Sequence, residues 1–430
     1  MIYWAPFLHF YQPPTQLHAI LKKVCNESYR PLLKMLLRHP HAKITINMCA
    51  VLTEMLNDHG ESDIIADITE LAKKNQVEFV DSAKYHAILP LIPSKEMHRQ
   101  IELNQKTNSY FFKDVYKARG FFPPEMCYST ELGKLLSTLG YDWVLISGVS
   151  CVEKWPLDCV YNVNFGKLKI NTFYRDDILS NRISFYDIDS TGFIKNLIDL
   201  SEDKDDIYVI TAMDAETFGH HIQNWEKLFL ADVYELISGV AKFDNLKQRT
   251  DLAESHKEIF ESGLENQVQV VTISELLDKF PSKPSKPPRP SSWSTTKEEI
   301  LKGNFYPLWQ GVDNDIHNLQ WEHIKICFDL VDAAEELKDE SEETERFFNI
   351  ARGLLDRAIH SCQFWWANKD RMWDVNMINK GLSLQEEVVL NAYKAIKASD
   401  VDEETLRQFY HEVIAARDAS NKIRDQLFLS

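Results

Sequence analysis

Strand-like and helix-like segments alternate along the first 280 residues of this chain, and this alternation limits its fold more than any other feature. Short apolar runs typical of buried strands occur at residues 2–10, 43–48, 77–80, 143–147, 207–211 and 268–271. The intervals between them have helical spacing, which predicts right-handed βαβ crossovers and a parallel sheet. No Gly-x-Gly-x-x-Gly follows a strand and no phosphate-binding loop motif is present. A barrel is therefore favoured over a nucleotide-binding open sheet.

The alternation ends at residues 281–292, a segment rich in proline, serine and lysine that we expect to be a linker. Beyond it the strand signal disappears. The segments with helical patterns there are residues 315–337, 342–359, 384–398 and 403–427. We therefore expect a catalytic barrel domain over residues 1–280, the linker, and an α-helical domain over residues 293–430.

Composition restricts the classes of partner and compartment. The formal net charge of -17 over 430 residues argues against nucleic-acid or anionic-membrane binding, because both need a basic surface. Seven cysteines without regular spacing indicate neither a disulfide framework nor a cysteine-based zinc site. The first ten residues lack the features of a signal peptide, and no apolar run approaches the roughly 20 residues of a membrane span. We expect a cytoplasmic protein whose oligomeric state the sequence does not restrict.

Two carboxylates follow predicted strands. Asp214 comes directly after the apolar run 207–213, and Glu125 comes after a short aromatic run and two prolines. The C-terminal ends of barrel strands meet at one rim, so both side chains are expected at the same mouth. Glycoside hydrolysis requires such a pair, one carboxylate to attack or to activate water and one to protonate the leaving oxygen. Asp214 also fits a helix cap in a solvated acidic loop, which the sequence leaves open.

The histidines allow a second interpretation, a metal-dependent hydrolase of the polysaccharide deacetylase kind. The residues that could bind a divalent metal in that case are His9, His86, His220 and His221, together with Asp214 and Glu216. Neighbouring histidines on a strand point to opposite faces, and these histidines lack the His-x-x-x-His spacing of a helical metal site. We therefore expect no metal and no other cofactor.

Four motifs in this order resemble successive conserved regions of glycoside hydrolase family 57. They are L-H-F-Y-Q-P-P at residues 8–14, V-E-F-V at 77–80, F-F-P-P-E-M at 121–126 and M-D-A-E-T-F-G-H-H at 213–221. C-Q-F-W-W-A at residues 362–367 resembles a fifth region. That family holds enzymes active on α-glucans, among them α-amylases, 4-α-glucanotransferases and branching enzymes.

The resemblance implies a distorted, TIM-like (β/α)7 barrel followed by a helical domain that closes the cleft. It implies Glu125 as catalytic nucleophile and Asp214 as acid/base in a retaining double displacement. The residues that it implies for sugar binding are His9, Gln12 and Glu78 from the barrel, with Gln363 and Trp366 from the helical domain. One departure is Tyr11, where the family often has a second histidine; a tyrosine hydroxyl still donates a hydrogen bond to a sugar.

Physical reasoning adds further expectations to this resemblance. A retaining enzyme needs its carboxyl groups about 5–5.5 Å apart. Burial and nearby negative charge should raise the pKa of Asp214, so that it begins the reaction protonated. His220 and His221 would tune the acid and hold the loop instead of binding a metal. Trp366 would reach toward the sugar while Trp365 packs inside the helical domain, because adjacent helical side chains point about 100° apart.

Three alternatives stay open at this stage. Hydrolysis and transglycosylation both fit the same pair of carboxylates, because the acceptor is either water or another sugar. The metal-dependent deacetylase is the second alternative, and a carbohydrate-binding relative without activity is the third.

Overall fold

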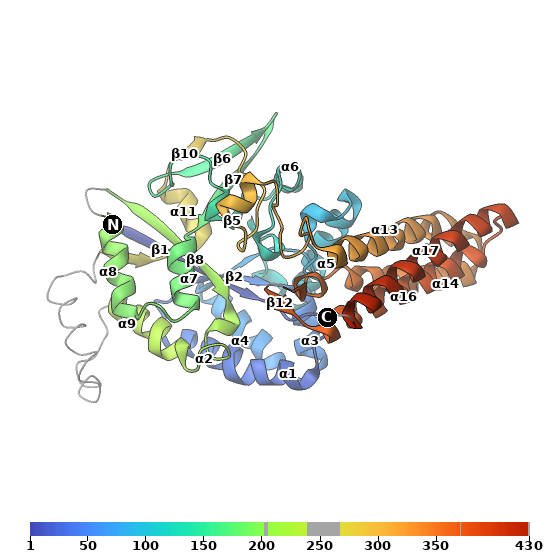
Figure 1. The fold of residues 1–430 in the computed structure, drawn as a ribbon. Coiled ribbons are helices and arrows are strands. Elements are labelled where there is room, and N and C mark those ends of the chain that lie inside the picture. The colour runs from blue at the N-terminus through green and yellow to red at the C-terminus, as the bar shows by residue number, and fades with distance from the viewer. Residues whose placement is uncertain (202–204, 239–266, 370, 429–430) are drawn as a thin grey trace. The chain divides into compact units, whose positions relative to one another are not determined.

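A computed structural model describes residues 1–201, 205–238, 267–369 and 371–428 (Figure 1). The chain forms two compact units, each of which draws on more than one stretch of sequence. The first comprises Met1–Gln12, Gln16–Lys84 and Pro93–Trp293, and the second comprises Pro13–Thr15, Tyr85–Ile92 and Ser294–Ser430.

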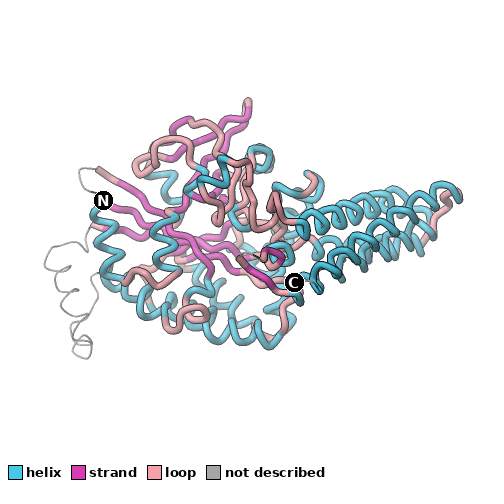
Figure 2. Tube along the Cα trace, in the orientation of Figure 1, coloured by secondary structure: helices cyan, strands magenta, loops and turns pink. Residues whose placement is uncertain are grey.

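Seven parallel strands form the barrel of the first unit, and helices cover its outside (Figure 2). The strands are β1 (Ile2–Phe10), β2 (Ile44–Met48), β3 (Val77–Val80), β4 (Gly120–Phe121), β5 (Trp143–Ser147), β7 (Leu168–Arg175) and β8 (Ile207–Asp214). Strand β1 pairs with β2 on one edge and with β8 on the other. A parallel bridge from Asp81 to Phe121 joins β3 to β4, and the Asp176 amide donates to the Ile210 carbonyl (2.8 Å) between β7 and β8. The predicted (β/α)7 barrel is confirmed.

Three further strands distort the barrel. Strand β9 (Val268–Val270) pairs with the first half of β1, and β6 (Val160–Phe165) runs antiparallel to β7. Strand β10 (Ser282–Pro284), within the segment that we expected to be a linker, pairs with β6. Further along the same segment, Ser291 and Tyr128 exchange backbone hydrogen bonds. Residues 281–292 are thus bonded to the first unit, which the linker interpretation did not anticipate.

Side-chain alternation separates the barrel interior from its helix-facing surface. Ala5 and Phe7 of β1 and Ile210 and Ala212 of β8 belong to one buried cluster inside the barrel. The residues between them, such as Trp4, Leu8, Val209 and Met213, belong to a second cluster under the helices. Because successive strand residues point to opposite faces, His9 and Asp214 continue the interior series.

Helices cover the outside of the strands. Their bounds are α1 (His18–Val24), α2 (Arg30–Arg38), α3 (Ala50–Asp58), α4 (Ser62–Lys73), α5 (Ser94–Phe112), α6 (Thr130–Leu139), α7 (Asp177–Ser184), α8 (Ser190–Ser201), α9 (Asp232–Ser238) and α11 (Ile273–Lys279). Helix α6 is capped at both ends, since the Ser129 side chain accepts from the Leu132 amide and Gly140 has a φ of 87°. Helix α5 ends at Phe112, and Gly120 begins β4.

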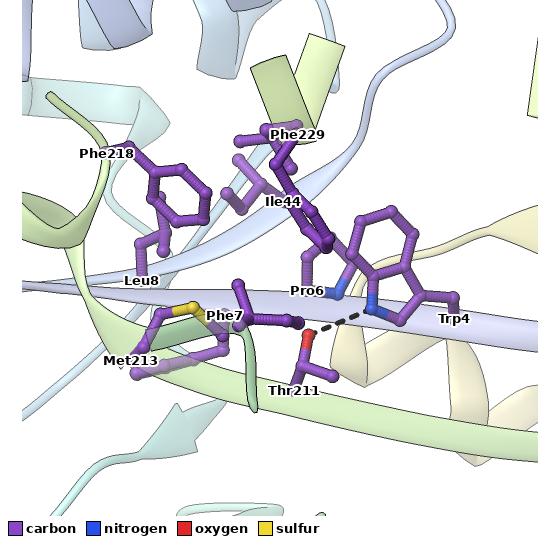
Figure 3. A pocket seen from close by; sticks show the side chains of 11 residues that line it. Trp4, Pro6, Phe7, Leu8, Ile44, Thr211, Met213, Phe218 and Phe229 are labelled. Atoms are coloured by element: carbon purple, nitrogen blue, oxygen red, sulfur yellow. Dashed lines mark hydrogen bonds between the residues drawn. The ribbon is translucent and has the colours of Figure 1, made fainter. Parts of the chain in front are cut away.

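An apolar pocket lies on the helix-facing side of β1 and β8 (Figure 3). Its lining includes Trp4, Leu8, Met213 and Phe229, and its polar contact is the Trp4 indole N–H that donates to the Thr211 hydroxyl (2.9 Å). No titratable side chain lines this pocket, so it belongs to the packing of the barrel and not to its chemistry.

The second unit consists mainly of helices. They are α12 (Lys297–Leu301), α13 (Asp315–Leu337), α14 (Glu342–Ala358), α15 (Cys362–Trp365), α16 (Val375–Lys397) and α17 (Glu403–Phe428). Helix α16 begins nine residues before the predicted start, because the Asp374 side chain caps it by accepting from the Asn376 and Met377 amides. An unpredicted antiparallel pair, β11 (Ala367–Asn368) with β12 (Met372–Trp373), precedes it. Among the described residues, no helix is long and apolar enough to cross a membrane.

Candidate active site

Three polar side chains lie in one row across neighbouring barrel strands. His9, near the end of β1, is the register partner of Asn47 on β2 and of Asp214 on β8. Adjacent strands are about 4.8 Å apart, and the three residues share the interior-facing series of their strands. The row therefore brings an imidazole, an amide and a carboxylate together inside the barrel, at the C-terminal ends of the strands.

Asp214 is the last residue of β8 and is half-buried. Burial raises the pKa of its carboxyl, and the positive charge of Arg175 opposes that rise. Arg175 ends β7 and is held firmly: its Nε donates to the Ala212 carbonyl (2.7 Å), and its two terminal nitrogens donate to Asp177 (2.9 Å) and Asn181 (2.8 Å). The net effect is a carboxyl that keeps its proton to a higher pH than an exposed aspartate.

Glu125 follows β4 in a tight turn. Its φ is 58° and that of Met126 is 52°, a left-handed backbone that non-glycine residues rarely adopt. Trp293 holds this turn with two hydrogen bonds, from its indole Nε1 to the Glu125 Oε2 (2.9 Å) and from its backbone N–H to the Glu125 carbonyl (3.1 Å). Strained backbone that is fixed by its surroundings is common at functional sites.

Trp293 links the two carboxylates. Its indole donates to Glu125, and the Arg175 guanidinium lies 5.9 Å from the centre of its ring. The His9 ring meets the Trp293 ring edge-on with centroids 6.1 Å apart. Asp214 is the register neighbour of His9 and lies within the electrostatic influence of Arg175. The structure therefore gathers Glu125, Asp214 and His9 around one arginine and one tryptophan.

Gln12 joins a second carboxylate of the 213–221 motif. Its Nε2 donates to Glu216 Oε1 (2.8 Å), and the Tyr29 hydroxyl donates to the same oxygen. Burial, followed by the charge of Asp214, raises the pKa of Glu216. Glu216, which the metal interpretation used as a ligand, is thus engaged by Gln12 and Tyr29.

His220 and His221 hold a loop against the segment that follows α1. The His220 Nδ1 lies 2.6 Å from a Glu27 carboxylate oxygen, and the backbone N–H of His221 donates to the Glu216 carbonyl (2.8 Å). Gly219 has a φ of +115°, and a Cβ there would lie 1.9 Å from the Glu27 carbonyl oxygen. The loop can approach this closely only with glycine at that position.

Glu78 lies one interior layer below the row. It is on β3 beside Thr45 of β2, whereas the register partner of Asn47 is Val80. One Glu78 oxygen accepts from the Thr45 hydroxyl (2.9 Å) and from the Ser274 backbone N–H (3.2 Å) at the start of α11. These contacts tie Glu78 to the floor of the barrel, and the structure does not bring it into the row with His9.

The two site residues predicted in the helical unit differ in exposure. The Gln363 side chain is fully buried: its Nε2 donates to the carbonyls of Ala358 (2.5 Å) and His360 (3.2 Å), and its Oε1 accepts from Gln385 (2.5 Å). Trp366 and Trp365 are both half-buried, with ring centroids 5.2 Å apart. The Gln363 side chain thus bonds to its own segment and to α16. Trp366 remains the predicted sugar contact of this unit.

Sequence reasoning did not find Arg175, Trp293 and Asn47. Arg175 is the last residue of β7, and the end of a strand is the signal that singled out Asp214, whereas Asn47 lies within β2. Trp293 follows the proline-rich segment, and only the pairing of that segment with the barrel unit places its indole beside Glu125.

Replacing Trp293 by phenylalanine is expected to lower kcat about tenfold with little change in Tm. Phenylalanine keeps a ring against His9 and Arg175 but removes the indole donor to Glu125, and a hydrogen bond to a charged group contributes about 1.5–3 kcal/mol. Steady-state kinetics and thermal unfolding check this expectation. Trp309, which is fully buried in the other unit, supplies the control substitution Trp309→Phe. An unchanged kcat in Trp293→Phe would contradict the positioning role.

Comparison with known proteins identifies the family of this chain. Residues 5–283 match the family described as glycosyl hydrolase family 57. The chain belongs to that family. It is 29% identical over 250 residues to an alpha-amylase of Pyrococcus horikoshii, covering 55% of this chain and 38% of that protein. It is 28% identical over 221 residues to a 4-alpha-glucanotransferase of Thermococcus kodakarensis, covering 49% of this chain and 32% of that protein. The chain thus aligns with about a third of the length of these relatives.

Solved structures agree on the fold. The 4-alpha-glucanotransferase of Thermococcus litoralis has a TM-score of 0.63 at 20% identity, with 92% of this chain and 59% of that chain covered. A branching enzyme of the same family from Pyrococcus horikoshii has a TM-score of 0.66 at 15% identity, with 97% and 94% covered. The second comparison spans nearly the full length of both chains, so the two proteins share the same overall fold.

Proposed function

We propose that this family 57 protein is a retaining glycoside hydrolase or glycosyl-transferring enzyme acting on α-glucans. The observation that carries the proposal is the cluster in which Trp293 donates to Glu125 while Arg175 lies over its ring and lowers the pKa of Asp214 against the effect of burial. The alpha-amylase and 4-alpha-glucanotransferase relatives support the substrate class. A formal net charge of -17 suits a neutral polymer better than an anionic one.

In the proposed reaction Glu125 is the nucleophile. Its ionised carboxylate attacks the anomeric carbon while protonated Asp214 gives its proton to the glycosidic oxygen, so the C–O bond breaks and a glycosyl–enzyme ester forms. Asp214, now a carboxylate, removes a proton from water or from a sugar hydroxyl. The resulting oxygen attacks the same carbon and releases Glu125.

Sugar binding at the reacting bond is assigned to His9, Gln12, Glu78 and Trp366, with Gln363 as a support of the Trp366 segment. His9 and Gln12 are supported by their contacts with the row and with Glu216. Glu78 rests on the family resemblance, because its contacts lie deeper in the barrel. A cytoplasmic location is also proposed, and seven cysteines without disulfides are compatible with a reducing compartment.

Incubation with maltoheptaose is expected to convert the substrate into other maltooligosaccharides. Shorter products alone indicate hydrolysis, whereas shorter and longer products together indicate transfer of glycosyl units. The experiment is repeated with the Glu125→Gln variant as a matched inactive control and with a chelator in the buffer. Full activity in chelator is expected, since the proposed chemistry uses two carboxylates. An unchanged maltoheptaose pool would favour a carbohydrate-binding relative, and loss of activity in chelator would favour the metal-dependent alternative.

A further inference from the structure

Asn47 makes an unusual set of contacts for a buried amide. Its side chain is fully buried on β2, and its Oδ1 lies 2.6 Å from the Nδ1 of His9. The Cys49 thiol also points at this oxygen, at 3.6 Å. Among the described residues, the Asn47 Nδ2 has no hydrogen-bond partner. Leaving a buried donor unpaired costs free energy of folding. We therefore expect the role of this amide to lie in the hydrogen bonds that its oxygen accepts.

The oxygen decides which nitrogen of His9 carries the proton. A carbonyl oxygen only accepts hydrogen bonds, so the Nδ1 of His9 must be the donor in this contact. Burial lowers the pKa of His9 to about 4, and the ring is therefore neutral near pH 7. A neutral imidazole protonated at Nδ1 carries an unprotonated Nε2, which is a hydrogen-bond acceptor.

We propose that Asn47 is a positioning residue that fixes His9 in its Nδ1–H tautomer, so that Nε2 accepts a hydroxyl hydrogen from the sugar. This inference rests on the proposed function for the identity of the ligand as a sugar. The amide at residue 47 is also uncharged, and this keeps His9 neutral. A carboxylate at the same position would stabilise an imidazolium at His9. A positive charge on the register neighbour of Asp214 would favour its ionised form and weaken it as an acid.

The other titratable groups around His9 in the first unit do not provide this control. Asp214 is its strand neighbour, and the Tyr11 ring stacks on it with centroids 5.9 Å apart. The Cys49 sulfur lies within 4.8 Å of a His9 nitrogen, and burial raises the pKa of that thiol, so it stays neutral. Glu125 is hydrogen-bonded to the Trp293 indole, whose ring meets the His9 ring edge-on.

The direct test is the protonation state of His9 measured by long-range 1H–15N NMR on histidine-labelled protein, with His9 assigned from a His9→Gln sample. The expected result at pH 7 is a neutral ring with its proton on Nδ1. In Asn47→Asp the expected result is an imidazolium. In Asn47→Leu, which offers no acceptor, the Nδ1–H tautomer should no longer predominate. A charged ring or an Nε2–H tautomer in the native protein would overturn the proposal, as would an unchanged ring in both variants.

Asn108 provides the matched control. It is equally buried, but it accepts from Thr53 and donates to the Met48 carbonyl, so Asn108→Asp buries a carboxylate without touching His9. The His9 signals should not change in that variant. If Asn47→Asp does not fold, Asn47→Leu still decides the matter, because leucine has the same branched side-chain skeleton and carries no charge.

Activity gives a second measurement. Asn47→Asp is expected to shift the alkaline limb of the kcat profile about one pH unit lower, because the new imidazolium beside Asp214 favours its ionised form. Asn108→Asp should leave that limb in place. The NMR result does not depend on turnover, so an inactive protein with the expected tautomer would refute the proposed function and leave the role of Asn47 intact. An unshifted limb together with an imidazolium would refute the electrostatic link to Asp214.

Discussion

Replacing Glu125 by alanine is expected to lower kcat on α-glucans by about 10⁴-fold or more, because losing a covalent nucleophile removes the first chemical step. Added azide should restore part of the turnover by entering the space of the missing carboxylate. That attack is a single displacement, so the glycosyl azide should have the inverted anomeric configuration. Product analysis by NMR with a fluoride or aryl glycoside donor tests both points.

The control for Glu125→Ala is Glu131→Ala. Glu131 is exposed in the first turn of α6, only six positions further along the chain. Its replacement should leave kcat unchanged. A Glu125→Ala protein that unfolds near the native Tm but turns over at the native rate would remove Glu125 from the mechanism.

Replacing Asp214 by alanine is expected to lower kcat on α-glucans by about 10²–10⁴-fold, the usual contribution of general acid–base catalysis. Glucosides with acidic phenol leaving groups need little protonation, so their first step should remain fast. Azide should then attack the glycosyl–enzyme and give a product of retained configuration. Retention with Asp214→Ala and inversion with Glu125→Ala would distinguish the two carboxylates, and the reverse pattern would exchange their roles.

The pH profile of the native enzyme should report Asp214 as well. Burial raises the pKa of this carboxyl, so the protonated, acid form persists to a higher pH than in an exposed aspartate. Activity should therefore fall as pH rises through that raised pKa. The Asp214→Ala variant, assayed on an activated aryl glucoside in its first step, should lack this alkaline limb. Persistence of the limb would assign it to another group.

Local patterns were sufficient to predict most of the fold. The helix at Asp315–Leu337 has its predicted bounds, because its apolar stripe and its Asn314 cap lie within one short stretch of sequence. Strand β10 was not predicted, since its pairing with β6 joins segments more than 100 residues apart. A proline-rich segment is predicted to be a linker when its hydrogen-bonding partners lie far away in the sequence. Here those partners are β6 and Tyr128.

The candidate site was predictable where a carboxylate or histidine directly ends a strand. Asp214 satisfied that rule, His9 was expected from the family resemblance, and the register places the two side by side. Asn47 was missed because an amide within a strand carries no charge signal, and Trp293 because its partner Glu125 is 168 positions away. The burial of Gln363 could not be predicted from its motif, since it depends on packing against α16.

The second unit includes two short stretches that precede most of the barrel in the sequence, Pro13–Thr15 and Tyr85–Ile92. From the latter, the His86 Nδ1 lies 2.8 Å from the Ser361 hydroxyl, and Ala87 forms a β-bridge with His360. These early stretches must wait during synthesis until residues near 360 have left the ribosome. Dividing the chain after residue 293 would therefore separate Tyr85–Ile92 from the residues of the second unit that it bonds to. The two halves are expected to regain the native set of contacts only when both are present, as in fragment complementation, and neither half alone is the natural folding unit.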